Sequence, residues 1–154
     1  MKTVSKSVLL SHSPEEMYAL VTDVARYAEF LPWCDRSEVL ASTEHEMTAK
    51  VGMSLGGLRQ SFTTANRHEP DRAVHMQLIE GPFSHLQGSW QFTPLGETDD
   101  EGRARACKVT FSLAYAFSSR TLATLVGPVF DKIAGNLVDA FVARADDVYG
   151  TKSL

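Results

Sequence analysis

The feature that most constrains the fold is an apolar stripe in the last segment of the chain, from about Arg120 to Tyr149. Apolar residues recur there at spacings of three and four, the period of one face of an α-helix. At 1.5 Å per residue the helix would extend roughly 40 Å, so it needs a long apolar surface to pack against. Because a proline cannot donate a hydrogen bond to the carbonyl of Thr124, we expect a kink or a fresh helix start at Gly127-Pro128. The stripe comprises Leu122, Val126, Val129, Phe130, Ile133, Leu137, Phe141, Ala145 and Val148.

The partner surface is predicted between Trp33 and Phe117, where the hydrophobic period changes to two. The clearest strand runs from Val109 to Phe117, with apolar side chains on one face and Lys108, Thr110, Ser112 and Ala114 on the other. Met47 to Met53 and Leu86 to Phe92 alternate in the same way. An antiparallel meander follows from the turn signals Gly56-Gly57, Glu69-Pro70-Asp71, Glu80-Gly81-Pro82 and the polar run from Gly96 to Gly102.

A strand and two short helices are expected before the meander. The strand is predicted near Val4 to Leu10, and a helix should begin at Ser13-Pro14, where a capping residue precedes a proline at the first helical position. A further helical turn from Arg26 to Leu31 should stop at Pro32. Together these elements predict a single α+β domain over residues 1–154, with a curved antiparallel sheet around the terminal helix. A sheet curved in this way tends to leave an apolar cavity beside the helix.

The formal net charge of −4 for 154 residues argues against a generalised nucleic-acid binder, and we expect no DNA partner. The apolar stretch Val8-Leu9-Leu10 is too short for a signal peptide, and no apolar run approaches the length of a spanning helix. We therefore expect a cytoplasmic protein, with peripheral contact to the inner membrane as an alternative. Cys34 and Cys107 lack the spacing of a metal or redox site, and no metal site is predicted.

Three short segments carry a resemblance to a known family: Phe30-Leu31-Pro32-Trp33-Cys34, Glu80-Gly81-Pro82-Phe83 and Gly88-Ser89-Trp90-Gln91-Phe92. With the order of elements, they resemble the coenzyme Q-binding protein family of the START-like, polyketide cyclase-related superfamily, over Val4 to Tyr149. Its bacterial members include the ribosome-association toxin RatA. The resemblance implies a helix-grip fold with a hydrophobic tunnel and non-catalytic binding of ubiquinone in respiratory electron transfer. The toxin branch implies binding to the large ribosomal subunit that blocks subunit association. Pro128 departs from the family, which commonly continues the helix with another residue.

Alternation and the helix stripe together select the residues that should line the cavity. We expect Met and aromatic groups to make an adaptable apolar surface. Trp33 and Phe83, aromatic residues on loops, are candidates for its rim, while Gln60, Thr64 and Asn66 fall in phase with Phe62 and can offer polar contacts to a quinone carbonyl. The predicted cavity residues are Met53, Phe62, Met76, Leu78, Trp90, Phe92, Phe111, Leu113, Tyr115, Phe130, Ile133 and Leu137.

Enzymatic patterns are weak in this chain. The five histidines show neither HxxxH nor HExxH spacing, there is no glycine-rich phosphate loop, and no catalytic residue is assigned. A polyketide cyclase-like enzyme built from Tyr115, His75 or Asp131 remains the third hypothesis, after quinone binding and ribosome binding. The ribosomal alternative draws on the basic residues Lys50, Arg59, Arg67 and Arg72, of which Arg59 and Arg67 should project from the face opposite Phe62.

Overall fold

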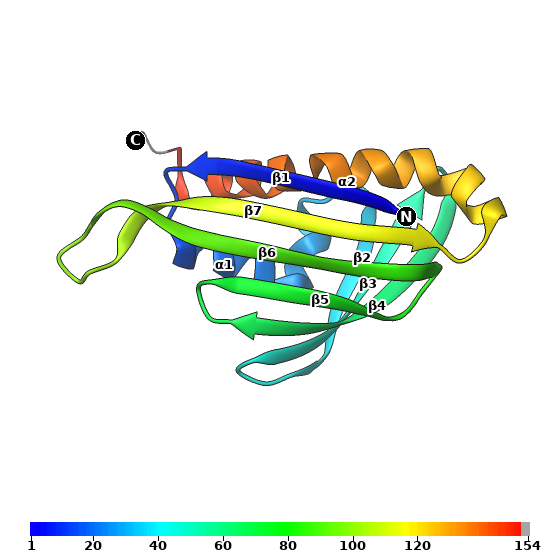
Figure 1. Cartoon of the computed structure of the whole chain (residues 1–154), viewed down its shortest axis with the longest axis horizontal. Coiled ribbons are helices and arrows are strands. Elements are labelled where there is room, and N and C mark those ends of the chain that lie inside the picture. Colours follow the sequence, from blue (N-terminus) through cyan, green and yellow to red (C-terminus); the bar gives the residue numbers. More distant parts are fainter. Residues whose placement is uncertain (152–154) are drawn as a thin grey trace.

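The computed structural model describes residues 1–151, in which an antiparallel sheet and a long helix pack against each other (Figure 1). The sheet order is β1-β7-β6-β5-β4-β3-β2. The strands are β1 Lys2–Leu10, β2 Cys34–Ser42, β3 Glu46–Leu55, β4 Leu58–Glu69, β5 Ala73–Glu80, β6 Phe83–Thr98 and β7 Ala104–Phe117. The helices are α1 Pro14–Thr22, the 3-10 helix η1 Val24–Glu29, and α2 Arg120–Tyr149. This is the predicted helix-grip α+β arrangement.

The start of α1 has a local cause. The Ser13 hydroxyl accepts a hydrogen bond from the Glu16 backbone N–H at 3.0 Å, and the Glu16 carboxylate accepts one from the Ser13 backbone N–H at 2.9 Å. This reciprocal pair satisfies two backbone donors that the first helical turn would otherwise leave free. Pro14 occupies the first turn, where a missing N–H costs nothing. The second helical segment, η1, begins two residues earlier than predicted and ends before Leu31.

Helix α2 has the predicted bounds and continues through Pro128, so the alternative of a fresh helix start is wrong. In Figure 1 its first turns, drawn in gold, are inclined to the remainder. The buried stripe is Val126, Phe130, Ala134, Val138, Phe141 and Ala145. Val129 and Val148, which we predicted in the stripe, are 36% and 50% exposed because they lie on its flanks. Ala134 and Val138, absent from the predicted stripe, lie at its centre.

The strand alternation is confirmed by burial. On β7, Val109, Phe111 and Tyr115 are almost fully buried beneath α2, while Lys108 and Ser112 are exposed on the opposite face. The β3–β4 hairpin turns at Gly56 and Gly57, whose φ angles of 58° and 87° favour glycine. Within residues 1–151 no helix is both long and apolar enough to cross a bilayer.

Candidate functional site

An internal cavity of about 100 Å³ lies between α2, η1 and the inner face of the sheet. Strands β3 to β7 supply one wall, α2 supplies the opposite wall, and the segment from η1 to Trp33 closes one side. Almost all of its lining is apolar, which is the typical character of a site for a hydrophobic molecule.

The structure brings most of the predicted cavity residues together on this wall. Eight of the twelve apolar residues predicted for the cavity line it: Phe62, Met76, Trp90, Phe111, Leu113, Phe130, Ile133 and Leu137. Thr64 and Asn66 also face it, and Trp33 lies half-buried at its side.

Six predicted site residues lie elsewhere. Three of them, Met53, Phe92 and Tyr115, are buried core residues, and Leu78 packs against the core half-buried. Each faces inward as alternation predicts, but its position along the strand lies beyond the cavity. Phe83, predicted on a rim loop, is the first residue of β6 and is 4% exposed, packed against Phe117 and Phe130 with ring centroids at 5.1 and 5.2 Å. Gln60 lies in a separate surface depression beside Arg59 and Gly81.

Several wall residues were missed by sequence reasoning. Ala134 and Phe141 belong to the α2 stripe, and Ala49, Val51, Leu86 and Gly88 belong to alternating strands already recognised. The apolar periodicity of α2 and of the strands could therefore have identified these six residues. Val24, Tyr27 and Leu31 come from the η1 segment, whose packing against the sheet no periodic pattern indicates.

One polar pair interrupts the apolar wall. Thr64 and Asn66 are buried neighbours on β4, and the Thr64 hydroxyl donates a hydrogen bond to Asn66 Oδ1 at 2.8 Å. This bond occupies the acceptor end of the amide, and it is the only side-chain hydrogen bond that Asn66 makes among residues 1–151, so its Nδ2 donor is available. An amide donor on an apolar wall is suited to a ligand that carries acceptors such as carbonyl oxygens.

Tyr27 is the sole ionisable side chain on the wall of this cavity within residues 1–151. Its hydroxyl donates to the Val21 carbonyl, so it is occupied by the fold. Burial, reinforced by Asp23 and Cys34, raises the pKa of the Tyr27 phenol well above its usual range. The phenol therefore stays protonated at neutral pH and is a poor general base.

The three residues considered for a cyclase do not converge on the cavity. Tyr115 donates to Asp131 Oδ1 at 2.6 Å, and the Lys2 ammonium pairs with the same carboxylate. Burial and the bond to Asp131 raise the pKa of Tyr115. Burial opposes ionisation of Asp131, but the bonds from Lys2 and Tyr115 outweigh it and lower the pKa of the carboxyl group. His75 lies on the outer face of the sheet, 2.5 Å from Glu69 Oε2.

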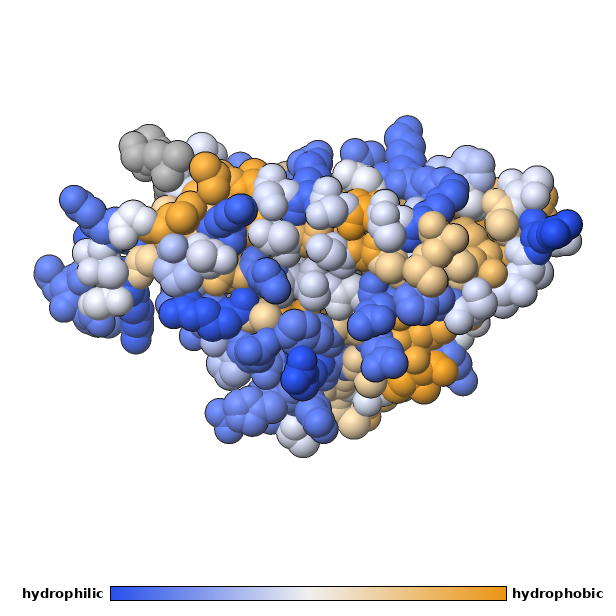
Figure 2. Space-filling model, viewed as in Figure 1, coloured by the Kyte–Doolittle hydropathy of each residue, from blue (hydrophilic) through white to orange (hydrophobic). Residues whose placement is uncertain are grey.

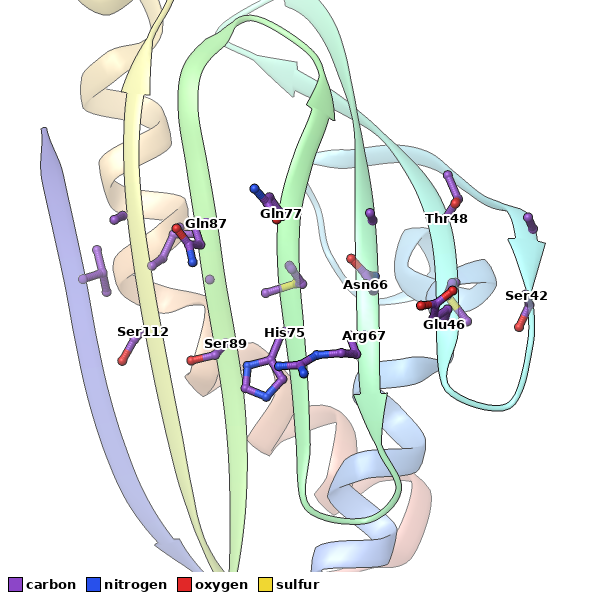
Figure 3. Close-up of a pocket in the computed structure, with 18 of the residues that line it drawn as sticks. Ser42, Glu46, Thr48, Asn66, Arg67, His75, Gln77, Gln87, Ser89 and Ser112 are labelled. Atoms are coloured by element: carbon purple, nitrogen blue, oxygen red, sulfur yellow. The ribbon is translucent and has the colours of Figure 1, made fainter.

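A second, larger depression of about 910 Å³ lies on the outer face of the sheet, open to solvent (Figure 3). Arg67 lines it together with His75, Gln77 and Ser89. The four basic residues noted in the sequence do not form one patch. Arg59 and Arg67 are separated by about 26 Å along β4, at about 3.3 Å per residue, and Arg59 pairs with Asp35 at 3.4 Å. Lys50 lies opposite Glu38, and Arg72 is in the turn before β5.

Comparison with known proteins gives a consistent picture over almost the whole chain. A family model described as polyketide cyclase / dehydrase and lipid transport matches residues 10–142. The chain is 45% identical over 150 residues to the ribosome association toxin RatA of Vibrio cholerae, covering 97% of this chain and 99% of that protein. It is 29% identical over 151 residues to the mitochondrial coenzyme Q-binding protein COQ10 homolog B of Xenopus laevis, covering 97% of this chain and 60% of that protein.

Solved structures share the fold at much lower identity. A crystal structure of a Thermus thermophilus protein superposes with a TM-score of 0.75 at 17% identity and 95% coverage of both chains. The Zhui aromatase/cyclase of a Streptomyces species superposes with a TM-score of 0.70 at 16% identity, covering 98% of this chain and 99% of that one. At these identities the similarity shows the shared architecture alone.

Proposed function

The chain belongs to the polyketide cyclase / dehydrase and lipid transport family, and from this we propose that it is a non-catalytic protein whose internal cavity binds ubiquinone. The observation that carries the proposal is the Nδ2 donor of Asn66, which has no hydrogen-bond partner among residues 1–151, on a mostly apolar wall. A quinone combines the two matching features, because its carbonyl oxygens accept hydrogen bonds and its isoprenoid tail is apolar. We place this activity in the cytoplasm, with exchange of the quinone at the inner membrane surface.

Two further observations support a binding role over catalysis. The protonated Tyr27 is tied to a backbone carbonyl and cannot exchange protons readily near neutral pH. The relative named as a coenzyme Q-binding protein aligns with 97% of this chain.

The cavity volume sets a requirement for this function. About 100 Å³ is well below the roughly 300–1,000 Å³ of common ligand sites, so a quinone ring must displace wall side chains as it enters. The half-buried Trp33, Met76 and Leu137 are the groups that we expect to move. Met76 has an unbranched thioether side chain that adapts readily to a new shape.

Organic extraction of the protein purified from a respiring host, followed by mass spectrometry, tests the proposal directly. We expect a quinone in substoichiometric to stoichiometric amount. Absence of any quinone, together with no binding of added decylubiquinone to the folded protein, would contradict the proposal.

Asn66→Leu is expected to weaken binding of decylubiquinone roughly tenfold, equivalent to about 1.4 kcal/mol, because the ligand loses one neutral hydrogen bond. Binding of decylbenzene, which has no carbonyl, should be unchanged. Both affinities can be measured by isothermal titration calorimetry. Met76→Leu, an apolar change on the same wall, is the control. It should change the affinities for decylubiquinone and decylbenzene by the same factor. Equal losses for both probes in Asn66→Leu would show that packing, and not a hydrogen bond, is responsible.

Association with the ribosome is a second candidate function, favoured by 45% identity to a protein named ribosome association toxin over almost the full length of both chains. In this case the target would be the large ribosomal subunit, and binding would block its association with the small subunit. We expect salt-sensitive co-sedimentation of the purified protein with large subunits. A protein that stays in the supernatant at low salt would remove this candidate.

A further inference from the structure

The outer depression is organised by strand register into rows of polar side chains. Across β1, β7, β6, β5 and β4, one row places Ser5 opposite Ser112, Ser112 opposite Ser89, Ser89 opposite His75, and His75 opposite Arg67. Neighbouring strands are about 4.8 Å apart, so the row is a regular series of hydrogen-bonding groups. Figure 3 shows Ser112, Ser89, His75 and Arg67 in this order across the sheet.

A second row runs beside the first. It consists of Ala114 on β7, Gln87 on β6, Gln77 on β5 and Ala65 on β4, each paired with the next. Because these strand residues alternate with the core residues, both rows project away from α2. Figure 2, which views this side of the molecule, shows mainly hydrophilic and intermediate side chains over its centre. The surface is therefore polar, uncovered by any described element and largely without charge.

Arg67 is the cation of this surface. Its guanidinium forms no ion pair or side-chain hydrogen bond within residues 1–151, and it extends over the same side of the sheet as His75 (Figure 3). His75 is held by Glu69 at 2.5 Å, whereas Glu46 lies opposite Arg67 on β3. An anionic group avoids Glu46 by approaching Arg67 from the side of Ser89 and His75, where the Glu69 carboxylate is already bound to His75.

We propose that this hollow binds the minor groove of an RNA double helix, with Arg67 on a phosphate and the serine and glutamine rows on ribose hydroxyls. The inference rests on the ribosome-associated function proposed above and adds the surface and the chemistry of its partner. An A-form helix presents a wide, shallow minor groove rich in 2′-hydroxyls, which are both donors and acceptors. Serine hydroxyls and glutamine amides match these groups, and the hollow accommodates a convex rod.

The surface also discriminates against other nucleic acids. Single-stranded RNA is usually held by bases stacked on several aromatic side chains, and the described lining of this depression has no Phe, Tyr or Trp, while its one imidazole, His75, is bound to Glu69. DNA lacks the 2′-hydroxyl that the rows would contact. Because Arg67 is the one unpaired cation among the described residues that line the hollow, few phosphates can be neutralised there, and the salt dependence of binding should be shallow.

Fluorescence anisotropy tests the proposal. Three probes are compared: an RNA duplex of about 16 base pairs, a DNA duplex of equivalent sequence, and the single RNA strand. The wild-type protein should prefer the RNA duplex over both others. Arg67→Gln should weaken RNA duplex binding about tenfold and reduce the slope of log K against log salt by about one. Arg59→Gln is the matched control, since Arg59 lies at the other end of β4 beside Asp35, and should change neither value. The double change Ser89→Ala and Ser112→Ala should reduce the preference for RNA over DNA.

Equal affinity for RNA and DNA duplexes, or a preference for the single strand, would overturn the proposal. So would retained RNA binding in Arg67→Gln with an unchanged salt slope. Co-sedimentation with large subunits in the absence of RNA duplex binding would assign the contact to a ribosomal protein, overturning this inference while leaving ribosome association intact. Failure of co-sedimentation would instead remove the function on which the inference depends.

Discussion

Replacing Phe141 by alanine is expected to lower the free energy of unfolding by about 3–5 kcal/mol. Phe141 is 1% exposed, and its ring centroid lies 5.5 Å from that of Tyr27 and 5.1 Å from those of Phe30 and Trp90. The ring therefore joins α2 to the η1 segment and to the sheet, and its removal leaves a void that these elements cannot all close. Urea denaturation followed by circular dichroism measures the change.

Leu125→Ala is the matched control for this experiment, because Leu125 lies on the same helix and is 65% exposed. Its effect should stay within about 0.5 kcal/mol. A loss below about 1 kcal/mol for Phe141→Ala would mean that the aromatic cluster repacks around the smaller residue, contrary to the close packing described here. Since Phe141 also lines the cavity, the variant should gain more thermal stability from decylubiquinone than the wild type does.

The second large effect is expected for ligand retention. Leu137 lies half-buried on the cavity wall, and Leu137→Asn places an amide against the apolar part of a bound quinone. The lost apolar contact and the desolvated amide should together weaken decylubiquinone binding about 30-fold, equivalent to about 2 kcal/mol. Phe130 and Ile133 face the same cavity from α2, and polar replacements there should act in the same direction.

Leu125→Asn introduces the same amide on the solvent side of α2 and should leave the affinity for decylubiquinone unchanged. Each variant must first melt cooperatively, because the cavity wall is also part of the core. Full quinone retention in a folded Leu137→Asn protein would contradict binding in this cavity and direct attention to the outer surface of the sheet.

Prediction from the sequence succeeded where the physical cause is local. Helix α2 was expected from Arg120 to Tyr149, and these are its bounds, because the period of its apolar residues is set by the helix itself. The inward direction of Phe111 and Tyr115 followed from alternation, since successive residues of a strand point to opposite faces. The helix start at Ser13 followed from hydrogen bonds that span three residues.

Positions along the strands depended on the tertiary structure. Alternation places Met53 and Phe62 on the same face, but strand register and the curvature of the sheet place Phe62 at the cavity and Met53 in the packed core. Phe83 was expected on an exposed rim because it follows Gly81-Pro82, yet neighbouring aromatic rings bury it. Contacts of this kind join residues far apart in the chain, and no periodic pattern records them.

By itself, the sequence determined the order and type of the elements and which face of each is apolar, because both follow from interactions among residues a few positions apart. Only the tertiary structure decided that the cavity encloses about 100 Å³, that η1 closes one side of it, and that Thr64 engages the acceptor of Asn66 while leaving its donor free. It also decided that Ser112, Ser89, His75 and Arg67 form one row. The physical reason is that volume, closure and cross-strand order depend on how separate elements pack and on the register between their strands.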